Sequence, residues 1–207
     1  MRRSFASVFV LALLLMGCSN PASDKSKAVT GEATSASPQA AAQGQKYLIT
    51  PQNSKVEFVA SKVTGSQSGS FKDFSGEIDY TGQVEKSRVT VTIQTNSVNT
   101  DADGLTTHLK TPDFFDVAKF PTATFTSTDI KPGGDKGASH TVTGNFTLHG
   151  VTKSISFPAT ITAAGDTITV ESTFSINRKD FGINYAGAAD NLIRDEVVMT
   201  LHVKATK

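Results

Sequence analysis

The chain has no tryptophan, a single cysteine and no excess of charge of either sign. One thiol cannot form an internal disulfide, so stability must come from packing and sheet pairing. The 20 basic and 19 acidic residues give a formal net charge of +1, and no long basic run occurs. Because nucleic-acid binding requires clustered lysine and arginine to neutralise phosphates, this composition argues against a nucleic-acid partner.

Long apolar runs are also scarce. The run from Phe5 to Met16, broken only by Ser7, is too short to span a bilayer, which takes about 20 residues. It follows Arg2-Arg3 and has the length of a signal-peptide core. The run ends in Leu15-Met16-Gly17-Cys18, which resembles a lipobox, with Met16 where a small residue is usual. We therefore expect a lipoprotein signal peptide over residues 1–17.

Cys18 is the candidate lipid anchor. The lipobox resemblance implies a diacylglycerol and an amide-linked acyl chain such as palmitate, and two or more chains hold a protein stably on a membrane. Ser19 follows the cysteine. In proteobacteria a serine there, rather than an aspartate, implies the outer membrane, with the domain facing the periplasm. An ordinary signal peptide with a chance cysteine is the alternative.

The next segment, residues 18–45, is expected to be a disordered tether. It is rich in Ala, Ser, Gln and Gly and has almost no large apolar residue. Such a segment cannot bury enough surface to offset the entropy of ordering.

From Tyr47 onward, apolar and polar residues alternate, which is typical of strands with one face inside and one in water. Eight such segments separated by short turns predict an all-β fold, an antiparallel barrel or sandwich. The segments are 56–60, 77–80, 89–94, 122–126, 142–148, 155–162, 168–176 and 197–204.

The stretch from Leu105 to Phe120 does not alternate. We expect one or two short helical turns there, with Pro112 near a helix start. In this interpretation Phe114 and Phe115 close one mouth of the barrel.

The sequence offers little for catalysis. Its four histidines, His108, His140, His149 and His202, have no metal-ligand spacing such as H-x-x-x-H. No nucleophile elbow of the G-x-S-x-G type occurs. We expect neither an enzyme nor a cofactor or metal site.

Several motifs occur together in one order: His108, Asp113-Phe114-Phe115-Asp116, Phe120-Pro121-Thr122-Ala123-Thr124-Phe125, residues 144–153 (GNFTLHGVTK) and residues 176–183 (INRKDFGI). This set resembles the YceI family over residues 46–207. The resemblance implies an extended eight-stranded, lipocalin-like antiparallel barrel with a deep apolar channel. It also implies binding of polyisoprenoids or related long-chain lipids, and dimers would be consistent with it.

The expected ligand is a quinone-type, polyprenyl or fatty-acid-like lipid, held for sequestration, transport or storage in the cell envelope. The alternative is a structural or interaction lipoprotein with a solid β core. His108, Arg178 and Asp180 are expected to be structural, with Arg178 bonded to a carboxylate or to backbone carbonyls. The inward rows predict these ligand-binding positions: Phe58, Ile78, Val91, Ile93, Phe114, Phe115, Phe125, Phe146, Phe157, Phe174 and Ile176.

Overall fold

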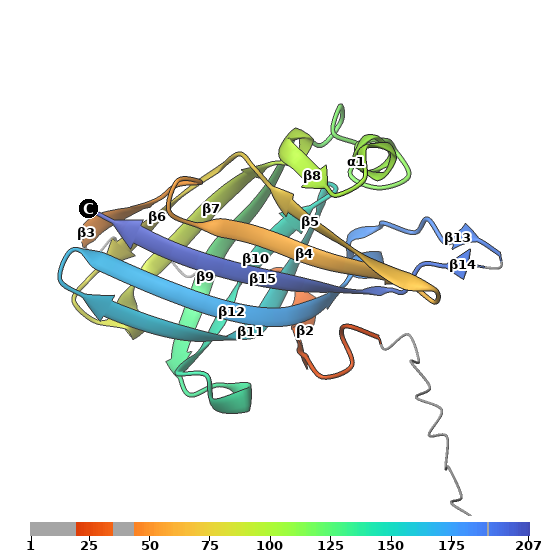
Figure 1. The fold of residues 1–207 in the computed structure, drawn as a ribbon. Helices are drawn as coiled ribbons and strands as arrows, with labels where there is room; N and C mark the ends of the chain where they lie inside the picture. Colours follow the sequence, from red (N-terminus) through yellow and green to blue (C-terminus); the bar gives the residue numbers. More distant parts are fainter. Residues whose placement is uncertain (1–19, 35–43, 190) are drawn as a thin grey trace, which may run out of the picture.

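The computed structural model describes residues 20–34, 44–189 and 191–207 (Figure 1). Most of the described chain is antiparallel sheet, and the described residues contain one α-helix, α1 (Asp103–Leu109). The strands are β1 (Ser26–Lys27), β2 (Val29–Glu32), β3 (Gln45–Ile49), β4 (Lys55–Lys62), β5 (Gly65–Phe71), β6 (Phe74–Tyr80), β7 (Arg88–Gln94), β8 (Val98–Thr100), β9 (Thr122–Pro132), β10 (His140–Leu148), β11 (Val151–Ala164), β12 (Thr167–Asn177), β13 (Gly187–Ala188), β14 (Asn191–Leu192) and β15 (Glu196–Thr206).

The main sheet closes on itself into an eight-stranded antiparallel barrel, as the family resemblance implied. Strand β15 closes the ring because it pairs with β12 on one side and with β3 and β4 on the other. Three of the eight wall strands are each made of two labelled strands that follow one another in the chain. These pairs are β3 with β4, β5 with β6, and β7 with β8. Neighbours in the ring follow one another in the chain, so the barrel is an up-and-down meander.

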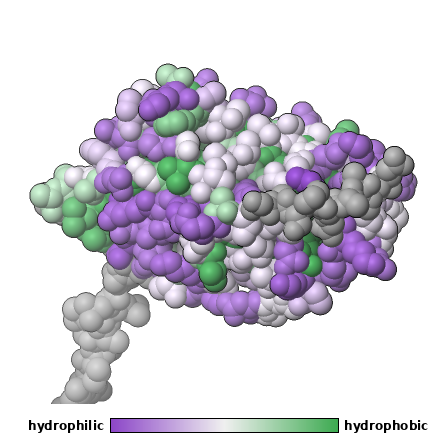
Figure 2. Space-filling view, turned by 180° about the vertical axis from the view of Figure 1, so that it is seen from behind, coloured by the Kyte–Doolittle hydropathy of each residue, from purple (hydrophilic) through white to green (hydrophobic). Residues whose placement is uncertain are grey.

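The alternation in the sequence sets which side chains face the interior. In one cross-strand row, Val91 of β7 is opposite Phe125 of β9, which is opposite Phe146 of β10. All three contact the buried hydrophobic core. Because strand side chains alternate with a period of two, a shift of one residue would turn this row to solvent. The face shown in Figure 2 is largely hydrophilic, with a group of apolar residues at its left edge and scattered apolar residues elsewhere.

The helical stretch differs from its prediction in detail. The helix begins at Asp103, two residues before the expected start, and ends at Leu109, so Pro112 follows the helix instead of starting one. A proline cannot continue a helix, and it also disfavours helical geometry in the residue before it. Turns then carry the chain from Lys110 to Phe120. Within the described ranges, no helix is long and apolar enough to span a bilayer.

The N-terminal segment is the largest departure from expectation. The signal peptide and Cys18 lie outside the described residues, but residues 20–34 were expected to be part of a disordered tether, and they are structured. Strand β1 pairs with β12 in parallel, and β2 pairs with β11 in antiparallel orientation. The tether prediction is therefore wrong for this part of the chain. Backbone hydrogen bonding orders it although it contains almost no large apolar side chain.

Candidate ligand-binding cavity

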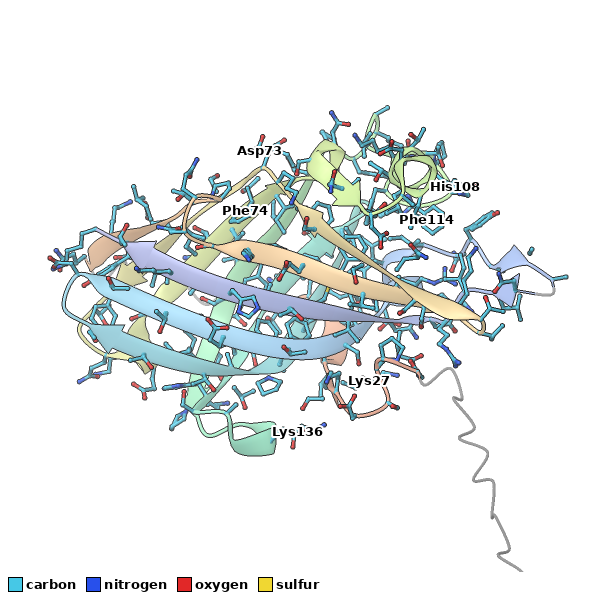
Figure 3. All side chains as sticks on the ribbon, in the orientation of Figure 1. Lys27, Asp73, Phe74, His108, Phe114 and Lys136 are labelled. Atoms are coloured by element: carbon cyan, nitrogen blue, oxygen red, sulfur yellow. The ribbon has the colours of Figure 1, made fainter. Side chains whose placement is uncertain are left out.

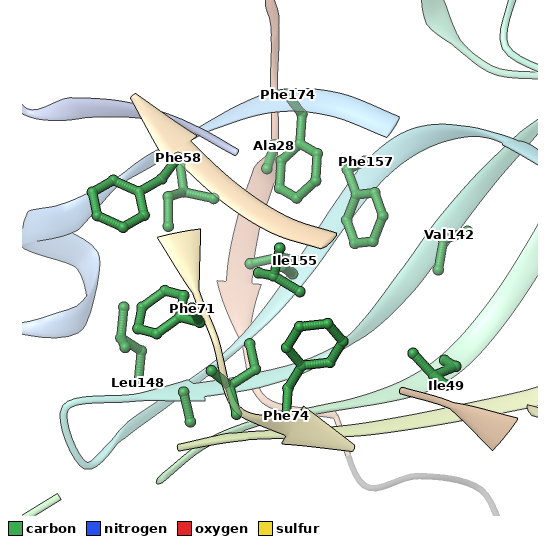
Figure 4. Close-up of a cluster of buried hydrophobic side chains, with 14 of the residues drawn as sticks. Ala28, Ile49, Phe58, Phe71, Phe74, Val142, Leu148, Ile155, Phe157 and Phe174 are labelled. Atoms are coloured by element: carbon green, nitrogen blue, oxygen red, sulfur yellow. The ribbon is translucent and has the colours of Figure 1, made fainter. Parts of the chain in front are cut away.

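The barrel interior is not solid, because it contains an apolar cavity of about 120 Å³. Every side chain that lines this cavity is Ile, Val, Leu, Phe or Met. The lining comes from all eight positions of the barrel wall, so the cavity depends on closure of the sheet. Figure 4 shows part of this interior, with Phe74, Phe157 and Phe174 directed into it.

A second cavity, of about 90 Å³, lies toward the end of the barrel that α1 covers. Arg178 is the one charged residue in its lining, which is otherwise apolar. The two cavities share four lining residues, Ile93, Phe146, Ile176 and Met199. These four side chains therefore lie between the two cavities; we call the cavities the larger and the smaller chamber, and these four residues the constriction.

All the predicted ligand-binding positions line one of the two chambers. Phe58, Phe114 and Phe115 line the smaller chamber. The remaining eight line the larger one, and three of these also face the smaller: Ile78, Val91, Ile93, Phe125, Phe146, Phe157, Phe174 and Ile176. The structure places these side chains together in the barrel interior.

Sequence reasoning missed other lining residues. Val197, Met199, Leu201 and Val203 alternate on β15 and were recognised as a strand, yet none was named as a lining position. Ile49 and Phe71 lie in strand pieces that are too short or too polar to show alternation, and Phe74 lies before the recognised segment 77–80 of the same strand. The alternation on β15 was therefore enough to identify its lining positions, whereas the segments of Ile49 and Phe71 have no alternation from which to identify them.

Aromatic rings form a connected layer inside the barrel. The rings of Phe157 and Phe174 are stacked, with centroids 4.3 Å apart, and Phe125 packs on Phe157 at 5.7 Å. Phe146 at the constriction packs edge-on against Phe181, which is fully buried. Such pairs add to the stability of a core beyond the area they bury.

The mouth beside α1 is closed by packed rings. The His108 ring lies edge-on to Phe114 and to Tyr185, at 5.0 and 5.1 Å (His108 and Phe114 are labelled in Figure 3). His108 Nε2 lies 2.8 Å from an Asp113 carboxylate oxygen. This contact fixes the imidazole and helps hold Phe114 over the smaller chamber. Phe114 and Phe115, the two residues expected at a mouth, both line the smaller chamber here.

Arg178 makes contacts of the kind expected for a structural role. Its guanidinium is buried and donates hydrogen bonds to the backbone carbonyls of Ile183, Ile193 and Arg194. It also contacts the Asp195 carboxylate at 3.4 Å. Burial lowers the pKa of this guanidinium, and Asp195 opposes that shift. Asp180, half-buried, lies in the same 3₁₀ turn.

Among the described residues, Arg178 is the one charged side chain in the lining of either chamber. In residues 20–34, 44–189 and 191–207, no group of three or more His, Cys, Asp or Glu side chains is placed to hold a metal ion. What the interior can do chemically is remove an apolar molecule from water.

Comparison with known proteins gives a consistent match. Residues 47–205 match the family model described as the YceI-like domain. A UPF0312 protein of Pseudomonas putida strain F1 is 36% identical over 132 residues, covering 60% of this chain and 68% of that protein. Protein YceI of Salmonella arizonae is 44% identical over 99 residues, covering 47% of this chain and 50% of that protein.

Solved structures show the same fold. The crystal structure of Burkholderia cenocepacia BcnA superposes with a TM-score of 0.68 and 26% identity, covering 76% of this chain and 99% of that chain. A polyisoprenoid-binding domain of Saccharophagus degradans superposes with a TM-score of 0.62 and 21% identity, covering 78% of this chain and 97% of that chain.

Proposed function

Because this chain belongs to the YceI-like family, we propose that its barrel binds a long apolar lipid of the polyisoprenoid class. The observation that carries the proposal is the two-chambered interior lined almost wholly by apolar side chains. A quinone or a polyprenyl chain fits this chemistry, and so does a fatty-acid-like lipid. The polyisoprenoid-binding domain of similar fold is consistent with the first two.

Energetics favour a long ligand. Association costs roughly 4–15 kcal/mol in lost freedom and ordering. Burial of each methylene contributes about 0.8 kcal/mol of favourable free energy. A short apolar molecule therefore barely offsets the cost of association, whereas a prenyl chain offsets it easily. Such binding requires no polar contact, which agrees with the lining of the larger chamber.

The resting chambers are smaller than a prenyl chain. The larger one, at about 120 Å³, is comparable with an engineered cavity of about 150 Å³ that takes up benzene. A long chain that occupies both chambers must therefore lie across the constriction and widen the barrel. Met199 suits this role, because an unbranched thioether repacks at low cost.

Organic extraction of the protein purified from its native membranes, followed by mass spectrometry, tests this function. We expect a prenyl lipid at near one per protein. An extract free of prenyl and acyl lipids would support the alternative, a structural lipoprotein that binds another envelope protein. We propose a binding role without catalysis, for sequestration, transport or storage.

We further propose that lipid on Cys18 anchors the protein in the cell envelope, at the outer membrane facing the periplasm. Cys18 stands two residues before Asn20, where the described chain begins. Two residues reach at most about 7 Å. An anchored barrel would therefore be held close to the bilayer rather than on a long tether. Cys18→Ser should abolish membrane fractionation, and an unchanged membrane fraction for this variant would contradict the proposal.

A further inference from the structure

Strands β11 and β12 separate along part of their length. They pair with each other only from Thr160↔Glu171 to Ala164↔Thr167, next to their connecting turn. Pro158 lies just before this paired stretch and has no backbone N–H to donate. The Ser172 hydroxyl donates to the Pro158 carbonyl there, in place of a ladder bond. Beyond this point the two strands no longer bond to each other.

Residues 26–32, which we call the strap, fill the opening between these strands. Ser26 and Lys27 pair with β12 opposite Phe174 and Ser175, and the Ala28 amide donates to the Ser175 carbonyl at 2.8 Å. The following residues, Val29 to Glu32, pair with residues 153–156 of β11. The strap is therefore an extra strand inserted into the barrel wall. It lies outside the residues that match the family model.

The strap covers the wall of the larger chamber. Ile155 and Phe157 of β11, with Phe174 and Ile176 of β12, line that chamber and flank the strap. Figure 4 shows Ala28 directed toward the same interior as Ile155 and Phe174. Ala28 is buried and belongs to the hydrophobic core. If the strap left, this side of the chamber would open sideways between β11 and β12.

Little apolar burial holds the strap in place. Ala28 is its one buried hydrophobic side chain, whereas Val29 is 72% exposed. Its other anchors are polar: Ser26 bonds to Asp135, and Lys27 and Glu32 pair with Glu196 and Lys153 near the surface. Water can replace the two ion pairs, which lie near the surface. A segment with few buried apolar contacts opens locally far more often than the strands around it.

We propose that the strap is a displaceable strand closing a lateral passage to the larger chamber, and that an apolar ligand enters and leaves between β11 and β12. The inference rests on the proposed lipid-binding function. It explains how a long chain could reach an interior whose mouth beside α1 is packed with rings. A sideways opening lets the chain enter along its length and avoids threading it past the constriction end to end.

A disulfide across the strap tests this. Val29 and Ser156 are antiparallel partners on the outer face, a pairing whose Cα separation suits a disulfide. In the full mature chain carrying Cys18→Ser, we would introduce V29C and S156C. The matched control is T162C with T169C, a partner pair that links the same two strands where they already bond. The probe is diphenylhexatriene, with uptake followed by fluorescence and release by transfer to phosphatidylcholine vesicles.

We expect oxidation of the strap disulfide to slow uptake and release by about tenfold or more, because it blocks local opening of the strap. Reduction of the same sample should restore both rates, and the control disulfide should leave them unchanged. Equal rates in the oxidised and reduced strap variant, or equal slowing by both disulfides, would overturn the lateral passage while leaving lipid binding intact. Absence of probe fluorescence in the reduced protein would instead contradict the proposed function, and the passage with it.

Discussion

Two glycines allow aromatic rings to lie directly on the barrel wall. A Cβ atom added at Gly144 would stand 2.4 Å from the Phe125 ring and 2.6 Å from the Thr126 carbonyl oxygen. A Cβ added at Gly69 would stand 2.2 Å from the Phe58 ring. Both rings line the ligand chambers. These glycines therefore set the shape of the interior, although neither contributes a side chain to it.

Gly144→Ala should destabilise the barrel. Overpacking of this kind costs about 1–3 kcal/mol, and here the conflict includes backbone that cannot move aside. The matched control is Gly65→Ala on β5, where an added Cβ meets nothing within 4 Å. Thermal unfolding followed by circular dichroism measures both. Equal melting temperatures for the two variants would contradict this prediction, because they would show that the Phe125 ring and the nearby backbone shift at little cost to accept the added methyl group.

Arg178→Lys should lower stability without emptying the chambers. An ammonium cannot reach three carbonyls and Asp195 in the geometry of the guanidinium fork, and each buried carbonyl left unpaired costs about 1–3 kcal/mol. The comparison is Lys179→Ala, which removes only a surface contact with Asp195 at 3.0 Å. Denaturant unfolding and lipid content of the folded fraction are measured together. Lost lipid at unchanged stability would give Arg178 a role in binding instead.

Among the elements, the strap should be the least protected strand of the structure. We expect the amides of residues 26–32 to exchange with deuterium faster than those of the long β12–β15 ladder, because the strap buries one small apolar side chain. Hydrogen–deuterium exchange with peptide mass spectrometry resolves both regions in one sample. Equal protection of the strap and the ladder would mean that the strap amides exchange only when the whole barrel unfolds, which would contradict local opening.

Acid should loosen the strap. Hydrogen bonds from Ser26 and Lys153 hold the pKa of Asp135 and of Glu32 below their ordinary values of 3.8 and 4.5. Carboxyl groups whose pKa is depressed on folding stabilise the fold above their ordinary pKa, and this contribution is lost as pH falls through the lower value. Strap amide signals in NMR spectra should therefore hold between pH 7 and 5 and change only below about pH 4. A change near pH 6 would point to a different group.

The elements also show what sequence patterns can and cannot predict. Eight alternating segments predicted the wall strands, because a strand with one buried face must alternate, but they left a barrel or a sandwich open, and the family resemblance implied the barrel. Strand β5 (GSQSGSF) showed no such signal, since the Phe58 ring packs on its Gly69 where a side chain would otherwise lie. The strap also lacked a signal in the sequence. Its composition resembles that of a linker, and its backbone bonds to two strands that are remote in sequence.

For the barrel as a whole, the inward rows predicted a shared apolar interior, and every predicted lining position faces a chamber. Sequence could not distinguish a filled core from a hollow one, because both require the same alternation. That difference depends on how far the side chains reach across a closed sheet. The result here is two chambers with a constriction at Ile93, Phe146, Ile176 and Met199.

The most direct test of lipid binding is the amount of bound prenyl lipid per folded protein in the wild type and in Ile93→Phe. Ile93 lies at the constriction and faces both chambers, so a larger ring there should fill space that the lipid needs. The control is Thr90→Phe, an exposed position on the same strand. We predict that Ile93→Phe stays folded and loses most of its lipid, while Thr90→Phe keeps the wild-type amount. A folded Ile93→Phe variant with undiminished lipid, or a wild type without any, would contradict binding inside the barrel.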